Sequence, residues 1–361
     1  MVKKTSLNNL KIKENVNLSE HTTISLGGDA KYFIVCKSSD EILEALDFAK
    51  KRSLPAQLIS GGSNIIFPDK GFDGIVIKNN IKGISEKEKD DHVFITVGAG
   101  EELDNFVEYC VEKSYSGIEC LSGIPGSVGA MPVQNVGAYG QETSEVLESV
   151  KVIDRNDLNL KTFSKEECQF GYRMSKFKSS DKDKYVIVEV NFKLHINKDP
   201  EIKYKALGER LNQNESFKNS DDVKSKLKIV RDTVISIRKE KSMVIDKADI
   251  NSRSCGSFFM NPVLNENEFS EFSKLCNDLK TDFPFFKNDN NYKIPAAWLI
   301  ENSGFPKGFR NGGVGISQNH TLALINIDGT TKELLELSEE IKNTVNNKFG
   351  IKLQTEPEII S

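Results

Sequence analysis

The sequence lacks the features that mark membrane, secreted and nucleic-acid-binding proteins. None of its 361 residues lies in an apolar run approaching about 20 residues, the length that crosses a bilayer. The lysines near the N-terminus are not followed by an apolar stretch, so a signal peptide is not expected. The 49 basic and 53 acidic residues give a net charge of −4, and no basic tract carries interleaved aromatics. We therefore expect a cytoplasmic protein without a membrane or nucleic-acid partner.

Cysteine is sparse, and the common catalytic motifs are missing. No CxxC or Cys/His spacing of a metal site occurs, so no metal is expected. GxxxxGK[ST], HExxH and GxSxG are also absent. Gly98 and Gly100 begin a dinucleotide-like pattern, but Leu103 stands where its third glycine belongs, which favours a plain strand–helix turn. We expect all six cysteines to be buried free thiols in a reducing compartment: Cys36, Cys110, Cys120, Cys168, Cys255 and Cys276.

Alternation of strand and helix patterns predicts an α+β protein of two or three domains. Residues 197–222 are polar and rich in lysine, and they are predicted to form an inserted loop before a helix that ends near residue 241. A final helix is predicted from the capping pair Thr330 and Glu333 to Gly350. Its apolar stripe consists of Leu334, Leu337, Ile341, Val345 and Phe349. Other predicted helices cover residues 38–52, 102–113, 265–276 and 296–302, and predicted strands cover 30–36, 57–59, 65–67, 93–97, 150–153 and 186–194.

A glycine-rich segment, residues 117–142, is the most distinctive part of the chain. Gly123, Gly126 and Gly129 recur at spacing three around Pro125, a pattern that prevents a helix and lets backbone amides turn toward one anion. A surface loop is the alternative, but it is disfavoured by the apolar residues within the segment, Ile124, Val128, Met131 and Val133. Residues 61–64, GGSN, form a second glycine turn. Two such turns favour a phosphate-bearing cofactor.

The stretch LSGIPGSVGAMPVQNVGAYGQE, residues 121–142, closely resembles the flavin-binding signature of the UDP-N-acetylenolpyruvoylglucosamine reductase family. The resemblance implies bound FAD and NADPH as electron donor. Further blocks match in order along nearly the whole chain: HTTISLGGDA at 21–30, ISGGSNIIF at 59–67, GYRMSKFK at 171–178, GSFFMNP at 256–262, AAWLIENSGFPKGFRNGG at 296–313 and TEPEI at 355–359. The implied FAD-binding residues are Gly61, Gly62, Ser63, Asn64, Ile65, Ser122, Gly123, Ile124, Pro125, Gly126, Val128, Gly129, Asn135, Gly137 and Ala138.

The resemblance also implies an arrangement of domains. A two-part FAD-binding domain of the vanillyl-alcohol oxidase/PCMH type would comprise residues 1–78, joined by the C-terminal tail 353–361, and residues 79–243. Residues 244–352 would form a smaller α+β domain that binds the substrate. The loop at 197–222 is typical of the longer family subtype. The expected partners are NADPH and a UDP-sugar enolpyruvate, and the expected state is a monomer or weak oligomer.

Three residues match the family's catalytic positions: Arg173, Ser257 and Glu356. Singly, each has an ordinary explanation as a surface ion pair, a turn residue or a solvated carboxylate. Together, inside matching motifs, they are expected to reduce an enol ether conjugated to a carboxylate. An arginine can bind that carboxylate, and a serine can protonate the enolate-like intermediate. Cys255 is interpreted as incidental, although an accessible thiol there would make the site sensitive to thiol reagents.

Three further residues are implied to contact the substrate: Tyr204, Lys241 and Asn261. Lys241 matches less closely, because Met243 and Val244 stand where the family usually has Leu-Pro. Two other functions remain open at this point: an FAD-linked sugar or alcohol oxidase of the same fold, and a non-catalytic flavin-binding module. Such oxidases often tether the flavin through His or Cys, and the glycine-rich segments contain no histidine.

Overall fold

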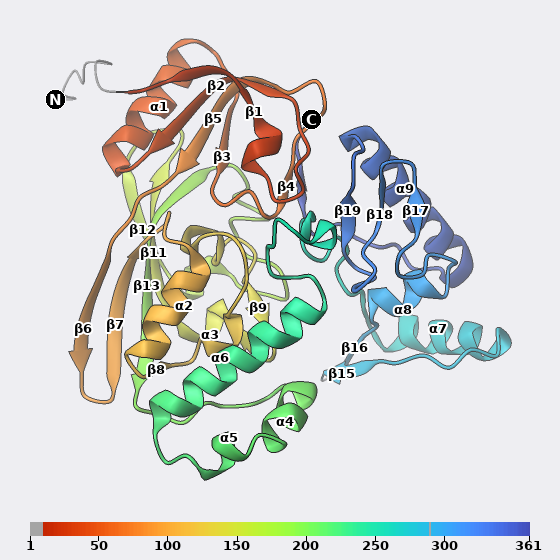
Figure 1. Cartoon of the computed structure of the whole chain (residues 1–361). Coiled ribbons are helices and arrows are strands. Elements are labelled where there is room, and N and C mark those ends of the chain that lie inside the picture. The colour runs from red at the N-terminus through yellow and green to blue at the C-terminus, as the bar shows by residue number, and fades with distance from the viewer. Residues whose placement is uncertain (1–9, 289) are drawn as a thin grey trace. The chain divides into compact units, whose positions relative to one another are not determined.

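The computed structural model describes residues 10–288 and 290–361 (Figure 1). The chain divides into two compact units. Unit 1 contains the described residues up to Val16, together with Asp29–Gly62 and Phe72–Glu240. Unit 2 contains Asn17–Gly28, Ser63–Gly71 and Lys241–Ser361. Within the described ranges, no helix combines the length and the apolar character that spanning a membrane requires.

The first part of unit 1 is a four-stranded sheet with the order β1-β2-β5-β3, in which β5 pairs parallel with both β2 and β3. One helix, α1, packs its apolar stripe on the sheet core, where Ile42, Ala45 and Ala49 are buried. Ser38 caps the start of the helix predicted at 38–52, because its side chain accepts a hydrogen bond from the Glu41 amide. The elements are β1 (Lys13–Asn17), β2 (Asp29–Cys36), α1 (Ser39–Lys51), β3 (Ala56–Ile59) and β5 (Phe72–Asn79).

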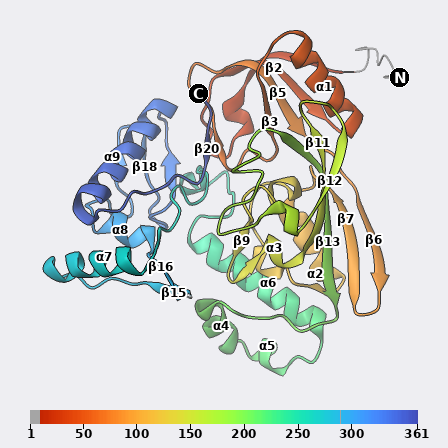
Figure 2. The same cartoon turned by 180° about the vertical axis from the view of Figure 1, so that it is seen from behind.

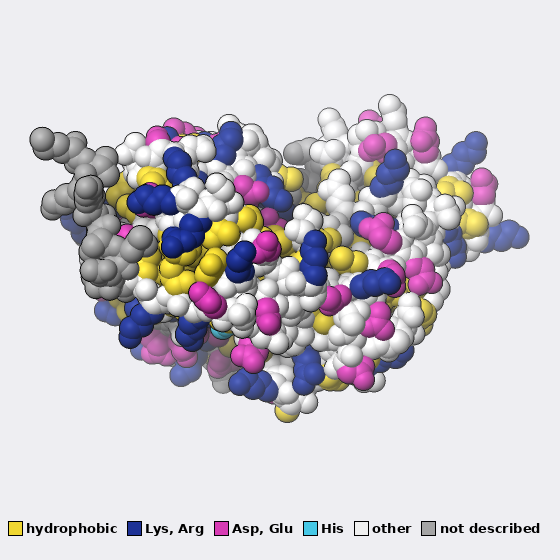
Figure 3. Space-filling model, turned by 90° about the horizontal axis from the view of Figure 1, so that it is seen from above, with side chains coloured by type: hydrophobic (Ala, Val, Ile, Leu, Met, Phe, Trp, Pro, Cys, Tyr) yellow, Lys and Arg dark blue, Asp and Glu magenta, His cyan; other side chains and the backbone are white. Residues whose placement is uncertain are grey.

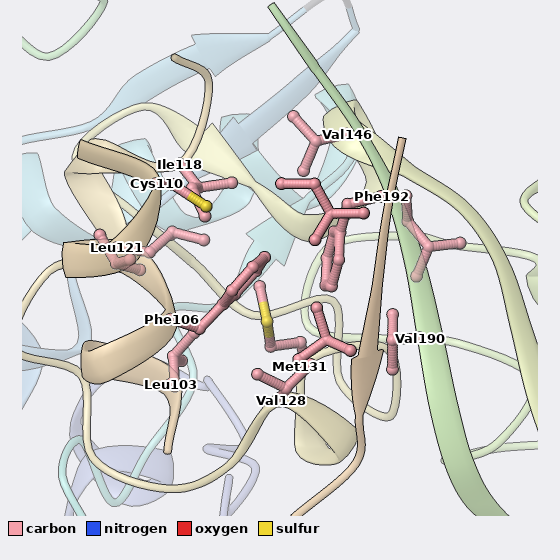
Figure 4. Close-up of a cluster of buried hydrophobic side chains, with 14 of the residues drawn as sticks. Leu103, Phe106, Cys110, Ile118, Leu121, Val128, Met131, Val146, Val190 and Phe192 are labelled. Atoms are coloured by element: carbon pink, nitrogen blue, oxygen red, sulfur yellow. The ribbon is translucent and has the colours of Figure 1, made fainter. Parts of the chain in front are cut away.

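The second part of unit 1 is an antiparallel sheet with the order β12-β11-β13-β7-β6, and β8 also pairs with β13. Helix α2 and the glycine-rich segment pack against this sheet. Figure 4 shows Phe106 of α2, Val128 and Met131 of the segment, and Phe192 of β13 in one buried cluster. The segment is therefore part of the core and not a surface loop. The elements are β6 (Ile84–Lys89), β7 (His92–Gly98), α2 (Leu103–Glu112), β8 (Tyr115–Ser116), η3 (Glu119–Leu121), η4 (Val128–Ala130), β9 (Gly137–Ala138), β10 (Gln141–Glu142), α3 (Thr143–Val146), β11 (Leu147–Asp154), β12 (Leu160–Ser164), η5 (Glu166–Cys168) and β13 (Tyr185–Ile196).

The predicted loop at 197–222 is wrong in part, because it contains two helices, α4 (Lys205–Asn212) and α5 (Glu215–Asn219). Leu207 and Leu211, one turn apart on α4, are buried against Val230 and Val234 of α6 (Val223–Glu240). Figures 1 and 2 show the three helices together in both views. The apolar stripe of α4 has only these two leucines, which is too short a pattern to indicate a helix within a polar stretch. The predicted helix that follows the loop is confirmed as α6.

Unit 2 is built around the long helix α9, whose predicted capping box and glycine end are both present. Gly350 has φ 69° and ends the helix, and all five residues of the predicted stripe are buried. Ile24, Leu26 and Ile66 are buried in the same core, which explains why two short N-terminal segments belong to this unit. The elements are η2 (Leu18–His21), β4 (Ile65–Ile66), η6 (Ile250–Ser252), β14 (Val263–Leu264), α7 (Glu266–Asp278), β15 (Phe286–Asn288), β16 (Asn291–Lys293), α8 (Ala296–Glu301), β17 (Arg310–Asn311), β18 (Val314–Ile316), β19 (Leu324–Asn326), α9 (Thr331–Phe349) and β20 (Glu358–Ile359).

Basic and acidic residues are nearly equal in number in this chain, and their side chains are mixed on its surface. On the face shown in Figure 3, lysines and arginines are interspersed with aspartates and glutamates. All six cysteines are buried and free, as predicted.

Candidate active site

The two glycine turns predicted from the sequence meet in unit 1. Gly61 follows β3, and a Cβ placed on it would lie only 2.7 Å from the Cα of Gly126. Beside this contact the hydroxyl of Ser60 donates a hydrogen bond to the hydroxyl of Ser127. Such a close approach of two main chains is available only to glycine, because any side chain would fill the space between them.

The segment around Gly126 is tied to the connection between β7 and α2. The Gly126 carbonyl accepts from the Leu103 amide at 3.1 Å, and the Val128 amide donates to the Glu101 carbonyl at 2.9 Å. Between these bonds, the amides of Gly126 and Ser127 have no acceptor among the residues that the structure describes. Unpaired amides at a glycine turn are suited to bind an anion. A pyrophosphate therefore fits the residues present here.

Other predicted FAD-binding residues have their polar groups used inside the protein. The Gly123 amide donates to Asp104 Oδ1 at 2.6 Å, and the Gly129 amide donates to the Ala99 carbonyl at 2.8 Å. The Ser122 hydroxyl is fully buried and donates to the Glu119 carbonyl at 2.6 Å. The Val128 side chain lies in the core. The glycine spacing thus builds the turn, but it does not aim every amide at one anion.

Arg173 stands at the tip of a tight turn in unit 1, with Gly171 and Met174 exchanging both backbone hydrogen bonds. Its φ of 53° is unusual for a residue with a side chain and costs about 1–3 kcal/mol. The guanidinium donates from Nη2 to the Gly137 carbonyl at 2.7 Å. Buried Asn135 holds the same turn, because its side-chain amide donates to the Gly171 carbonyl at 3.1 Å. The structure therefore groups Arg173 with three predicted FAD-binding residues, Asn135, Gly137 and Ala138.

Ser257 and Glu356 come from two neighbouring extended segments of unit 2. The Glu356 amide donates to the Phe258 carbonyl at 2.9 Å, and Phe259 forms an antiparallel bridge with Thr355. A third segment joins them, because the Glu358 amide donates to the Asn64 carbonyl at 3.0 Å. The Ser257 side chain is partly exposed, and its hydroxyl has no hydrogen-bond partner among the described residues, so it is available to a ligand. The structure thus brings Ser257 and Glu356 together with Asn64 and Ile65, the latter in β4.

Cys255 is enclosed, and this corrects the expectation that it could make the site sensitive to thiol reagents. Its side chain is buried, with Sγ 3.8 Å from the Ile65 carbonyl oxygen. Burial raises the pKa of Cys255 to about 12. The reactive thiolate is therefore scarce at neutral pH, and reagents have no direct access.

The three predicted substrate residues differ in their surroundings. Tyr204 is exposed at the start of α4, with its ring edge-on to Tyr139 at a centroid distance of 5.4 Å. Lys241 is partly buried and directly follows α6. Asn261 has a structural role at the start of α8. Its Oδ1 accepts a hydrogen bond at 2.9 Å from the amide of Ala296, the first residue of that helix. Tyr204 belongs to unit 1, and Asn261 belongs to unit 2.

A charged cluster that no sequence motif indicated lies behind the glycine-rich segment. Asp104, which accepts the Gly123 amide, is also bound by both terminal nitrogens of Arg231, at 2.5 and 3.0 Å. Arg238 donates from Nε to the Gly123 carbonyl at 3.1 Å. The two arginines are seven residues apart on α6, which places them on one face of the helix. In the sequence, two arginines seven residues apart on a predicted amphipathic helix were the only pattern that could have indicated this cluster.

No metal was expected, and one group in the described part of the chain contains potential ligands: Asp91, His92 and His195. The two histidines are partners across β7 and β13. His92 Nδ1 lies 2.6 Å from Asp91 Oδ1, and His195 Nε2 lies 3.4 Å from the ammonium of Lys198. The three side chains and the Lys198 ammonium form a polar cluster near the surface.

Comparisons with known proteins agree with these features. Residues 30–161 match the FAD binding domain family, and residues 248–360 match the family "UDP-N-acetylenolpyruvoylglucosamine reductase, C-terminal domain". The chain is 43% identical over 353 residues to a UDP-N-acetylenolpyruvoylglucosamine reductase of Thermobifida fusca, covering 96% of this chain and 97% of the relative. It is 38% identical over 351 residues to one of Salinispora arenicola, covering 96% and 94%.

A solved structure of the Thermus caldophilus UDP-N-acetylenolpyruvylglucosamine reductase has the same fold. Its TM-score is 0.64 at 23% identity, with 98% of this chain and all of that chain covered. The predicted α+β class with an FAD-binding domain is confirmed. The chain belongs to the UDP-N-acetylenolpyruvoylglucosamine reductase family.

Proposed function

We propose that this protein reduces UDP-N-acetylglucosamine enolpyruvate to UDP-N-acetylmuramate, a step of peptidoglycan precursor synthesis, with FAD and NADPH. Membership of the family supports this function. The assignment of FAD as cofactor is supported by the close approach of Gly61 to Gly126. Next to this contact, the amides of Gly126 and Ser127 have no acceptor in the described chain. Gly61, Gly62 and Gly126 would hold the FAD pyrophosphate there. When bound, FAD supplies a hydride acceptor for NADPH and a hydride donor for the enol ether.

Arg173 is proposed to bind the substrate carboxylate. Addition of hydride to the terminal carbon of the enolpyruvyl group leaves negative charge on the carbon beside that carboxylate. A guanidinium that pairs with both carboxylate oxygens stabilises the resulting enolate-like state. The left-handed backbone of Arg173 and its bond to the Gly137 carbonyl restrict the directions that the guanidinium can take. Less reorganisation is then needed when the charge develops.

Ser257 is proposed to deliver the proton that completes the reduction. A free serine hydroxyl is a weak acid, but the enolate-like carbon is a strong base, so position decides the rate. The hydroxyl of Ser257 makes no hydrogen bond to a described residue, which leaves its proton for the substrate. Glu356, whose amide donates to the Phe258 carbonyl, is proposed to stabilise the enolate-like intermediate together with Arg173.

The remaining assignments follow the family resemblance. Tyr204, Lys241 and Asn261 are proposed to contact the sugar nucleotide. Residues 1–78 with 353–361, and residues 79–243, are proposed to hold FAD, and residues 244–352 the substrate. We propose that the protein acts in the cytoplasm as a monomer or weak oligomer, without a nucleic-acid or membrane partner.

Ser257→Ala separates this function from its alternatives. The wild-type protein should be yellow, be bleached by NADPH, and recover its colour when the enolpyruvyl sugar nucleotide is added without oxygen. The variant should keep FAD and its bleaching by NADPH but lose sugar-nucleotide reduction by about 10²–10⁴-fold. A colourless wild-type protein would contradict the cofactor assignment. Unchanged turnover in the variant would exclude Ser257 as the proton donor.

A further inference from the structure

The turn at Gly123 is held by charged side chains that have no role in the proposed reaction. Gly123 is buried and has φ 69°, in the left-handed region. Its amide donates to Asp104 on α2, and its carbonyl accepts from Arg238 on α6. Both main-chain polar groups of this one residue are therefore bound by side chains from two different helices.

Asp104 is itself fixed by Arg231. Two guanidinium nitrogens contact its two carboxylate oxygens, at 2.5 and 3.0 Å, and the Arg231 side chain is only 9% exposed. Partial burial acts to raise the pKa of Asp104, but the hydrogen bonds from Arg231 and from the Gly123 amide outweigh it and lower the pKa. Asp104 is therefore ionised at neutral pH. A bidentate pair of this kind also restrains direction, so the acceptor offered to Gly123 has a defined position.

The other end of the same turn is restrained by the backbone. The Val128 and Gly129 amides donate to carbonyls of the connection between β7 and α2. Pro125 has no N–H to offer. Between the fixed points at Gly123 and Val128, the amides without an acceptor in the described chain are those of Gly126 and Ser127. The restraints at both ends therefore determine where these two amides point.

The charges of the cluster balance. Arg231 lies within ion-pair distance of two carboxylates, those of Asp104 and Glu108, at 2.5 and 3.9 Å, and Arg238 adds a second guanidinium group. Both arginines are less than a tenth exposed, so solvent screens their charge weakly. The cluster therefore acts on the turn through the positions of its hydrogen bonds, and an excess of charge of one sign is not needed.

We propose that Asp104 and Arg231 are positioning residues for the FAD pyrophosphate. They hold Gly123 so that the Gly126 and Ser127 amides remain directed at the anion before it binds. This inference rests on the proposed function, because it takes FAD to be the ligand. It goes beyond that function in assigning FAD affinity to a side-chain pair that does not itself touch the cofactor.

The test measures FAD affinity of the full-length protein from which FAD has been removed. Flavin fluorescence would be titrated for the wild type, Asp104→Ala, Asp104→Asn and Arg231→Lys. Asp104→Ala should weaken FAD binding about tenfold or more, since it removes a charge-assisted bond to the turn. Asp104→Asn keeps an acceptor for the Gly123 amide, so it should restore part of the affinity. Glu112→Gln is the matched control, because it breaks an exposed ion pair of 2.8 Å between Lys224 and Glu112 that joins the same two helices.

Urea unfolding of the same proteins without FAD separates positioning from general destabilisation. The inference is supported if the order of FAD affinity is wild type and Glu112→Gln, then Asp104→Asn, then Asp104→Ala, with unfolding midpoints that do not follow this order. It is overturned if Asp104→Ala binds FAD like the wild type, or if Glu112→Gln weakens binding equally. Absence of FAD binding by the wild type would instead overturn the proposed function. If Asp104→Ala does not fold, Asp104→Asn and Arg231→Lys carry the same comparison.

Discussion

Gly61→Ala tests the close approach of the two glycine turns. A Cβ on Gly61 would lie 2.7 Å from the Gly126 Cα and 3.3 Å from its backbone N and C. An ordinary van der Waals contact begins near 3.4 Å, so the main chain at Gly126 must move by about 0.7 Å or more. Gly61 does not have a positive φ, so alanine is compatible with its backbone conformation. The substitution therefore changes only the space between the two turns.

The expected effect follows from the cost of overpacking, about 1–3 kcal/mol. The displacement of Gly126 moves the amides that bind FAD. If the whole cost appears in FAD binding, FAD affinity falls roughly 5- to 150-fold. The assay is a titration of the protein without FAD, with flavin fluorescence as the signal. Turnover at saturating FAD should recover most of the wild-type value, because Gly61 holds the cofactor and does not take part in the chemistry.

Gly208→Ala is the control for this prediction. Gly208 lies in α4, where a Cβ would meet only Ile202 Cγ2 at 3.6 Å, an ordinary contact. The substitution should stabilise the helix by about 1 kcal/mol and leave FAD affinity unchanged. Wild-type FAD affinity in Gly61→Ala would refute the reasoning that the two turns form the pyrophosphate site.

Arg173→Ala and Glu356→Gln should each reduce turnover about 10²–10³-fold while FAD remains bound, and loss of the flavin spectrum would show that they were misassigned. Because Cys255 is buried with a pKa of about 12, a disulfide reagent should leave the native protein unmodified at pH 8 and react only after unfolding, so rapid native labelling at this residue would contradict the structure. Burial raises the pKa of Glu119, outweighing the hydrogen bond from the Gly117 amide and others that act to lower it. The folded protein therefore binds this proton more tightly than the unfolded chain, and the free energy of unfolding should fall as pH rises from the unfolded toward the folded pKa. Glu119→Gln should flatten this dependence, measured by urea unfolding between pH 4 and 7, and an unchanged slope would exclude Glu119 as its source.

Local sequence signals were enough wherever the fold depends on short-range chemistry. Ser38 and Thr330 both cap the helices predicted for them, and Gly350 ends the last helix with a positive φ. These features rest on hydrogen bonds within four residues, which the chain makes wherever it is placed. The helix α4 was missed for the opposite reason. Its apolar stripe has only two buried leucines, Leu207 and Leu211, and their packing partners lie on α6, outside any local window.

In the candidate site, too, some features follow from the local sequence and others depend on distant residues. Glycine spacing indicated that residues 123–129 do not form a regular helix and that an anion is their ligand. It could not show which amides are available, because that depends on distant acceptors. Asp104 takes the Gly123 amide, and Ala99 takes the Gly129 amide.

The sequence by itself determined the family, the α+β class, the capped helices and the identity of Arg173, Ser257 and Glu356 as the residues to examine. These follow from motifs and periodicities that are read along the chain. Only the tertiary structure decided that Gly61 meets Gly126, that Cys255 is enclosed, and that Asp104 with Arg231 restrains the glycine turn. The physical reason is that available space, burial and hydrogen-bond satisfaction depend on groups far apart in sequence, and folding alone brings those groups together.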